Sequence, residues 1–399
     1  MSGIDLVKSN RSFRLLLVAR AASHIGDGVA LVALILYIQA EQNTGTAVGA
    51  LLLAKALPRI LGPVAGALAD KVDGRTAMIV CDLGQAFVYG TIAIWLPPLP
   101  LLLALVAVTS ILDTVFTPAS RSAVTAIVDR PALPSANAWL GSTLNLQVAA
   151  GPLLGGVLVA AGGISGALAA NSLTFFVSVL LLVRLPRLEV ASDGDEPQGL
   201  VAETRAGLAF ALRHRTARAL VLTLFLGVAF GAIDNVALVF LAREELGAGP
   251  VGFGAVNAAF GVGMLIASVI LIKWGGRMHP RNLFLLGWLL TGAGTIATGF
   301  APTLVLAALV QALAGIGNAA DNVASDTLVQ QNVPRPMLGR VFGLISTAAY
   351  VGGGIAYAAG GPLLDATSPK FVFVLGGGLV LGVVVLAQRL LPPARELRT

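Results

Sequence analysis

The sequence has few charged residues, few histidines and a single cysteine, and each shortage excludes a class of protein. Charged residues are 12% of the 399 residues, about half the share found in soluble domains, which excludes an ordinary soluble protein. Cys81 is the only cysteine, so no intramolecular disulfide and no cysteine-based metal cluster can form. No His/Glu cluster, G-x-S-x-G element or nucleotide-binding loop occurs. We therefore predict no enzyme activity, no metal site and no cofactor.

Apolar residues take the place of the missing charges. They make up 56% of the chain, and the mean hydropathy is +0.87. Apolar runs of about 18 residues or more recur along the whole length, and each is long enough to cross the roughly 30 Å hydrocarbon layer of a bilayer. The sequence therefore predicts an all-α polytopic membrane protein. The formal charge of +6 resides in its loops, so the predicted partner is the lipid bilayer and not nucleic acid.

Hydropathy and turn signals divide the chain into twelve predicted spans. Clusters such as "PPLP" at 97–100 and "AGGISG" at 161–166 mark the short turns between them. The first span follows a basic N-terminus like that of a signal peptide, but no small-residue cleavage site follows, so we expect it to be retained. The predicted spans are 12–39, 46–69, 76–97, 99–127, 134–161, 165–185, 217–241, 250–273, 282–300, 302–328, 339–364 and 370–391.

Basic residues alternate between successive loops. Only Arg243 and Lys370 lie in the loops of one set, whereas the termini and the loops of the other set carry the remaining loop arginines and lysines. Because lysine and arginine are retained on the cytoplasmic side, both termini are predicted to be cytoplasmic, which requires an even number of spans.

One long connection, residues 186–216, separates the sixth and seventh spans. It contains the polar run "SDGDEPQG" and then a stretch in which Leu200, Leu208 and Leu212 share one helical face. This pattern is typical either of an amphipathic helix on the cytoplasmic membrane surface or of a solvated linker helix. The predicted domains are thus a six-helix bundle over 1–185, the loop over 186–216 and a second six-helix bundle over 217–399.

The two halves resemble each other at an offset of roughly 205 residues. "DTVFTPASRSAVTAIVDRPAL" from Asp113 parallels "DNVASDTLVQQNVPRPML" from Asp321, and Asp27 parallels Asp234. The offset is 208 for Asp113 and Asp321, 207 for Asp27 and Asp234, and 205 for Arg130 and Arg335 within the first two stretches. Six plus six spans in parallel duplication are typical of a transporter built from two similar bundles.

Motifs along the chain resemble the major facilitator superfamily. "GALADKVDGRT", from Gly66 to Thr76, is similar to its signature loop between spans two and three. "GPLLGGVL" in span five resembles an element of its drug:proton antiporter branch. "RSAVTAIVDRPALPSANAWLGSTLNLQVAAGPLLGG" and "GNAADNVASDTLVQQNVPRPMLGRVFGLIS" resemble the macrolide- and enterobactin-exporter-like group. The resemblance covers essentially the whole chain and implies a twelve-helix transporter in a bacterial plasma membrane, acting as a monomer.

The signature loop implies a conformational latch. Asp70 ends span two, where a carboxylate is attracted to the N-terminus of another helix, and in this family the partner is span eleven. Gly66 permits a close helix approach. Lys71 and Arg75 are expected to bridge to Asp129 or to lipid phosphate. The arginine comes one residue later than in the family pattern, so the aspartate carries this prediction.

Glycine and proline residues in span five are candidates for a role in gating. Gly151, Pro152, Gly155 and Gly156 remove side chains and one backbone donor from the helix. Such helices approach their neighbours closely, as sliding during alternating access requires. Static tight packing also explains these residues, and the resemblance favours the gating role.

Four aspartates, one on each of spans one, four, seven and ten, are the candidate transport residues: Asp27, Asp113, Asp234 and Asp321. A carboxylate at membrane depth costs roughly 2.5–3.5 kcal/mol on insertion scales and is rarely kept without a role. The resemblance implies that these four spans line the central cavity. A carboxyl group buried in an apolar medium takes up a proton readily unless a cation is close. We therefore expect the aspartates to bind protons, a cationic substrate, or both in turn.

Polar neighbours complete the candidate cavity: His24, Asn235, Asn318 and Asn322. His24 lies three residues before Asp27 and therefore near its face of the helix. As a lone histidine it is more often a packing residue than a proton carrier. Span four lacks the mid-helix arginine of many related antiporters and carries Asp113 there instead.

Three functions remain in competition. The first is proton-coupled export of amphipathic small molecules such as drugs, antibiotics or siderophores. The second is import of a polar metabolite by the same fold, although the predicted cavity has few of the amides and aromatics typical of sugar carriers. The third, a membrane enzyme or receptor, has no supporting motif in the sequence.

Overall fold

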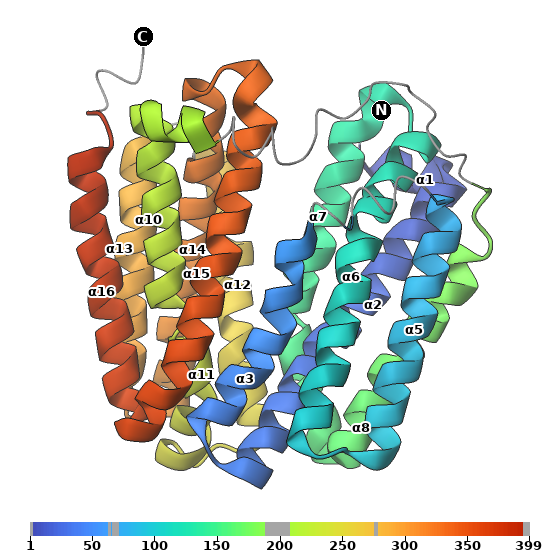
Figure 1. Ribbon diagram of the computed structural model, residues 1–399, viewed down its shortest axis with the longest axis horizontal. Coiled ribbons are helices and arrows are strands. Elements are labelled where there is room, and N and C mark those ends of the chain that lie inside the picture. Colours follow the sequence, from blue (N-terminus) through green and yellow to red (C-terminus); the bar gives the residue numbers. More distant parts are fainter. Residues whose placement is uncertain (1–2, 63–64, 66–71, 188–207, 275–277, 394–399) are drawn as a thin grey trace. The chain divides into compact units, whose positions relative to one another are not determined.

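The structure, a computed structural model, describes residues 3–62, 65, 72–187, 208–274 and 278–393. Within these ranges every regular element is a helix (Figure 1). Ten of the described helices are long and apolar enough to cross a membrane. The expectation of an all-α polytopic membrane protein is confirmed.

The predicted spans two and five are not among these ten helices. In span two, α3 (Gly45–Ala56) passes into a short 3-10 helix, η1 (Leu57–Leu61). Pro58 supplies no N–H donor there, which favours the tighter turn. In span five, α7 (Leu133–Ala149) has only 17 residues and is followed directly by α8 (Gly151–Leu182). Both spans are therefore interrupted helices.

A kink lies inside α8 at the glycine cluster that was predicted to be a turn. Gly163 has φ 70° and ψ −177°, a conformation that only glycine adopts without strain. The kink separates the part of α8 that belongs to predicted span five from the part that belongs to span six.

The chain forms two compact units, each of which borrows a short segment from the other half of the sequence. The first, unit 1, comprises residues 1–42, 54–194 and 249–258, and the second, unit 2, comprises 43–53, 195–248 and 259–399. Unlike the predicted uninterrupted halves, these units exchange the first part of α3 and the first part of α12 (Pro250–Trp274). One helix in each half is thus shared between the two units.

Unit 1 is organised around α2 and α8. The helix α2 spans Arg11–Gln42, and the unit also contains α1 (Gly3–Ser9), α5 (Gly74–Trp95), α6 (Leu99–Ile127) and the 3-10 turn η2 (Arg130–Ala132). The helix α8 packs along both α2 and α5, and α5 packs on α6. Phe13, Met78 and Phe116 meet in the apolar core of the unit. This packing brings the polar faces of α2, α5 and α6 toward one another.

Unit 2 is organised around α13 and α10. Its helices are α10 (Arg215–Gly231), α11 (Asp234–Phe240), the π-helix η3 (Leu241–Glu245), α13 (Pro280–Gly299), α14 (Leu304–Asn332), the 3-10 turn η5 (Arg335–Met337), α15 (Leu338–Ala366) and α16 (Pro369–Leu390). The helix α13 packs against α14 and α16, and α10 packs against α15 and α16. Phe284, Trp288 and Leu328 lie in the core.

Much of the central connection lies outside the described residues, including Leu200. Residues 208–213 are helical. Leu208 and Leu212 are both exposed, as a helix lying on a membrane surface or in solvent requires. The predicted amphipathic helix therefore remains a prediction for most of its length.

Candidate functional site

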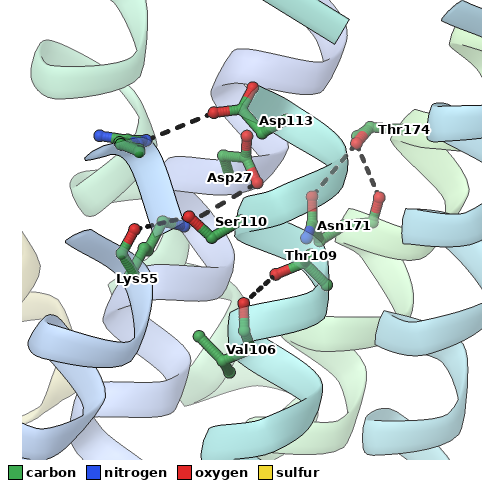
Figure 2. Close-up of polar contacts among 9 residues, drawn as sticks. Asp27, Lys55, Val106, Thr109, Ser110, Asp113, Asn171 and Thr174 are labelled. Carbon is green, nitrogen blue, oxygen red and sulfur yellow. Dashed lines mark hydrogen bonds and ion pairs between the residues drawn. The ribbon is translucent and has the colours of Figure 1, made fainter. Parts of the chain in front are cut away.

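An ion pair joins the first two spans in the middle of unit 1. Lys55 is the penultimate residue of α3, and its Nζ lies 4.0 Å from Oδ1 of Asp27 on α2. Figure 2 shows the two side chains pointing toward each other. Both are largely buried, with side-chain exposures of 16% for Lys55 and 12% for Asp27. The carboxylate in the first span thus has a cationic partner.

A second ion pair lies one helical turn further along the same segment. Arg59 of η1 places Nη2 3.4 Å from Oδ2 of Asp113 on α6. Its side chains are more exposed than those of the first pair, at 36% for Arg59 and 24% for Asp113. The two basic residues are four positions apart, so they project from neighbouring turns toward acids on two different helices.

A hydrogen bond holds the end of α3 against α6 between the two ion pairs. The hydroxyl of Ser110 donates to the backbone carbonyl of Lys55 at 2.6 Å. Ser110 lies one turn before Asp113 on α6, as Figure 2 shows. The segment from Lys55 to Arg59 is therefore held in unit 1 by two ion pairs and this bond.

These charges enclose a small polar cavity. It is lined by Asp27, Lys55, Arg59, Gln85, Tyr89, Thr109, Ser110 and Asp113. Only about 10 Å³ of it is open to water, which is about the space of a single water molecule. A substrate-sized molecule enters only if the ion pairs separate and the cavity widens.

Aromatic packing fixes one wall of the cavity. The ring of Tyr89 on α5 stacks on Phe175 of α8 with centroids 5.9 Å apart and an interplanar angle of 7°. Tyr89 is 1% exposed. Its orientation is thus set by packing, and its side chain lines the cavity together with Lys55.

Arg20 and His24 on α2 lie near this cluster but have other partners. The guanidinium of Arg20 stands 4.7 Å from the centroid of the Phe116 ring, a cation–π distance. Nδ1 of His24 lies 3.0 Å from the hydroxyl oxygen of Thr143 on α7. His24 is thus placed by the contact with α7, and its ring is buried.

In unit 2, Asp234 lies at a break in the seventh span. The helix α10 ends at Gly231 and α11 begins with Asp234. The half-buried carboxylate lies near Thr295 of α13 and the backbone of Asn235. The side chain of Asn235 is exposed and donates to the carbonyl of Ala232 at 3.3 Å. The break therefore places an acid and an amide at the start of α11.

Asp321 is buried between α13 and α14. It is 1% exposed, and a Cβ added at Gly287 on α13 would come within 2.8 Å of the Asp321 Cβ. The Asn322 backbone approaches the carboxylate, but neither oxygen has a well-formed hydrogen bond within the described part of the chain. Such a group is costly to bury in its charged form.

The two asparagines on α14 are more accessible than Asp321. Nδ2 of Asn322 donates to the carbonyl of Asn318 at 2.8 Å and approaches its Oδ1 at 3.2 Å. Asn322 is exposed and Asn318 is half-buried. In this part of α14 these amides are accessible, whereas Asp321 is not.

The helix boundaries align the two halves of the chain more exactly than the sequence comparison does. The helices α6 and α14 begin at Leu99 and Leu304 (304 − 99 = 205) and both have 29 residues. At this offset Asn318 is the counterpart of Asp113. Asp321 corresponds to Phe116 instead, so the sequence pairing of Asp113 with Asp321 is three residues out of register.

Of the predicted latch residues, Gly66, Asp70 and Lys71 lie outside the described residues. Arg75 on α5 donates a hydrogen bond to the carbonyl of Val183. Asp129 lines a polar hollow near the N-terminus together with residues of α1 and α2. Arg75 thus joins α5 to the end of α8, and the latch itself remains a prediction.

Glycines of span five bring its backbone into direct contact with the backbones of α2 and α12. A Cβ at Gly151 would lie 2.7 Å from the Cα of Gly28 on α2, and a Cβ at Gly155 would lie 3.0 Å from the carbonyl oxygen of Val29. Gly156 meets the carbonyl of Pro250 at the start of α12. The predicted close helix approach is therefore present at this motif, including next to Pro152.

Lys55 and Arg59 are the functional candidates that the sequence analysis did not identify. The signal is visible in the predicted second span, since two basic residues four positions apart interrupt the apolar run "LLLAKALPRILG". A basic residue at membrane depth is as costly as an acid. The same argument that singled out the aspartates therefore applies to them.

Comparison with known proteins places the chain in a family. The profile of the transmembrane secretion effectors matches residues 8–397. The uncharacterised MFS-type transporter YfiS of Bacillus subtilis strain 168 is 28% identical over 408 residues, covering 98% of this chain and 96% of the relative. The enterobactin exporter EntS of Escherichia coli O1:K1 is 26% identical over 400 residues, covering 97% and 95%.

Solved structures agree on the fold. The nucleoside transporter NupG has a TM-score of 0.76 at 14% identity, covering 95% of this chain and 98% of that one. The POT family transporter PepTSo has a TM-score of 0.78 at 12% identity, covering 98% of each chain. Since the family profile spans nearly the whole sequence, this chain belongs to the transmembrane secretion effector family of major facilitator transporters.

Proposed function

We propose that this protein is a secondary active transporter that exports amphipathic small molecules in exchange for protons. It acts by alternating access, as a single copy in a bacterial plasma membrane, with both termini in the cytoplasm. The observation that carries the proposal is the cluster of two ion pairs in unit 1, in which Asp27 and Asp113 hold a segment of the second span through Lys55 and Arg59.

The cluster can couple proton binding to a change in helix packing. A proton on Asp27 removes the charge that attracts Lys55, and a proton on Asp113 does the same for Arg59. Both cations lie on one short segment, so its attachment to α2 and α6 weakens when the acids are neutral. A carboxylate binds either a proton or a basic group of a substrate, but not both at once. This competition is what exchange of protons for substrate requires.

The remaining candidates take supporting roles in this proposal. Asp234, with Asn235, and the amides of Asn318 and Asn322 supply polar contacts for the substrate from unit 2. Asp321 is a second candidate proton carrier because it is buried without a cationic partner among the described residues. Membership of a secretion family and the similarity to an enterobactin exporter favour export over uptake.

The experiment compares proton-driven transport in inverted membrane vesicles. Compounds are first selected by testing whether cells that express the chain resist a panel of antibiotics. Asp27→Asn is then expected to abolish transport of the selected compounds while the protein remains in the membrane at normal amounts. Glu41→Gln is the matched control, since it removes an exposed acid from the same helix. Undiminished exchange in Asp27→Asn would remove Asp27 from the mechanism.

A second candidate function, uptake of an acidic metabolite together with protons, is favoured by one observation. In each ion pair the cation is the more exposed partner. Protonation of Asp27 removes the charge that holds Lys55, which can then pair with an acidic group of a substrate, so proton and substrate bind together. The pH dependence of substrate affinity distinguishes the two functions. Exchange requires weaker substrate binding at lower pH, whereas joint uptake requires tighter binding at lower pH.

A further inference from the structure

A carboxylate caps the N-terminus of α3. Oδ1 of Asp365, at the end of α15, accepts a hydrogen bond from the backbone N–H of Gly45. Oδ2 accepts one from the N–H of Thr46 at 3.0 Å and another from the Thr46 hydroxyl. The hydroxyl oxygen of Thr44 accepts from the N–H of Ala47 at 3.3 Å. The first three N–H groups of α3 are thus satisfied, two of them by another helix.

Charge and geometry both favour this contact. The first N–H groups of a helix have no partner within it and carry partial positive charge. Asp365 lies next to the last residue of α15, so its carboxylate reaches the end of α3 from a neighbouring helix of unit 2. Hydrogen bonds from N–H groups to a carboxylate are stronger than those between neutral groups.

Below the cap, α3 and α15 touch backbone to backbone. A Cβ at Gly49 would lie 2.5 Å from the carbonyl oxygen of Tyr357, and a Cβ at Gly361 would lie 2.6 Å from the Cα of Thr46. Figure 1 shows the two helices side by side. The glycines therefore allow the approach that brings Asp365 to the end of α3.

The repeat-related contact in unit 1 forms without such a cap. At the offset of 205, Gly254 of α12 corresponds to Gly49, and the pair Pro152 and Gly156 of α8 corresponds to Tyr357 and Gly361. Gly254 meets the carbonyl of Pro152 in the same way.

The residues that would form a cap differ, however. Ala160, which has no carboxylate, stands at the position of Asp365, and Pro250, which has no N–H donor, stands at that of Gly45. The close approach of the helices does not need the carboxylate, so the cap is an added feature of α3 and α15.

We propose that Asp365 is a conformational latch, closed on the first turn of α3 in one state of the transport cycle and released in the other. The helix α3 passes from unit 2 to unit 1 between residues 53 and 54. A movement of one unit against the other therefore has to break either the cap at Asp365 or the ion pairs of Lys55 and Arg59. Asp365 contacts the first turn of α3, which begins the second span. Asp70, the latch aspartate expected from the sequence, comes directly after the predicted end of that span.

The topology predicted from loop charges places the turns next to Gly45 and Asp365 on the outer side of the membrane. Release of the latch is therefore expected to open the outer side and to close the inner side. This inference does not depend on the identity of the substrate or of the coupling ion.

The test measures cysteine labelling at both ends of α15 with a membrane-impermeant maleimide, in a Cys81→Ser background. Leu364→Cys reports on the outer contact, because Leu364 packs against Gly45. Gly343→Cys reports on the other end, where the position is exposed and open. Whole cells are used for the first reporter and inverted vesicles for the second.

Asp365→Asn is expected to raise labelling at Leu364→Cys roughly tenfold, the factor for losing about one charge-assisted hydrogen bond, and to lower labelling at Gly343→Cys. Thr46→Val, which removes one of the three bonds, is expected to give smaller changes in the same directions and serves if Asp365→Asn does not fold. Glu41→Gln is the matched control for charge. Labelling that rises at the outer reporter alone would show a static helix cap and overturn the latch, as would no change at either reporter.

Discussion

Nζ of Lys55 and Oδ1 of Asp27 face each other across 4.0 Å from two neighbouring helices of unit 1. The pair is long for a salt bridge and largely buried, so the two charges neutralise each other without forming a tight hydrogen bond. Such a pair is easier to open than a bidentate one, and opening releases an acid and a base at the same place. This relation makes Asp27 part of an ion pair and not an isolated acid.

Removing one partner of this pair should cost more than removing both. Lys55→Met leaves the Asp27 carboxylate buried without its cation, and we expect it to lower the free energy of unfolding by about 2 kcal/mol, somewhat less than for a fully buried pair. The double variant Asp27→Asn/Lys55→Met should recover most of that loss but not transport. Thermal unfolding of the purified proteins in detergent measures the difference. Equal stability of the single and double variants would show that the two charges do not interact.

We expect Asp321 to lower the free energy of unfolding and to be needed for proton-driven transport. Its buried carboxyl group lacks well-formed hydrogen bonds in the described structure, so Asp321→Leu, of similar branching, is expected to raise the free energy of unfolding by about 1–3 kcal/mol. Because a residue kept at such a cost usually has a role, proton-driven transport should fall in the same variant. Transport at the normal rate would remove Asp321 from the proton pathway.

The glycine contact between α8 and α12 should tolerate no side chain. Gly254→Ala places a methyl group 3.2 Å from the Cα of Gly156 and closer still to the carbonyl of Pro152. We expect a loss of about 1–3 kcal/mol of stability from overpacking, together with slower transport. Gly249→Ala, five residues earlier with nothing within 4 Å, is the matched control. If both variants behave alike, the close approach has no mechanical importance.

His24 should be dispensable for transport. Its ring nitrogen contacts Thr143 on α7, so its placement is explained by helix packing. His24→Gln keeps a polar group that can reach Thr143, and we expect near-normal transport rates and an unchanged pH profile in inverted vesicles. A shifted pH profile in this variant would instead assign His24 a part in proton transfer.

The acids of the site were predictable from the sequence, but their partners were not. A charged residue in an apolar run can be recognised without a structure because its cost in a membrane is local. Pairing depends on which helix faces meet. Lys55 and Arg59 reach Asp27 and Asp113 only because η1 follows α3 closely and lies against α6, and no periodicity in the sequence reports that contact.

The repeat was visible in the sequence, but its exact register was not. Matching aspartates with aspartates paired Asp113 with Asp321, whereas the helix boundaries pair Asp113 with Asn318. Chemical similarity misleads here because a shift of three residues keeps a side chain near the same face of the helix but exchanges the half-buried Asn318 for the buried Asp321. That shift separates the accessible amides of α14 from its buried acid.

The sequence by itself determined the membrane-embedded helical class, the family and the positions of the costly charges, because these follow from composition, run length and local motifs. Only the tertiary structure decided which charges neutralise each other, and that Asp365 of α15 caps α3. It also showed that α3 and α12 are shared between the two compact units. The physical reason is that ion pairs, helix caps and glycine contacts join residues up to about 320 positions apart, and their energies depend on distances that only packing sets.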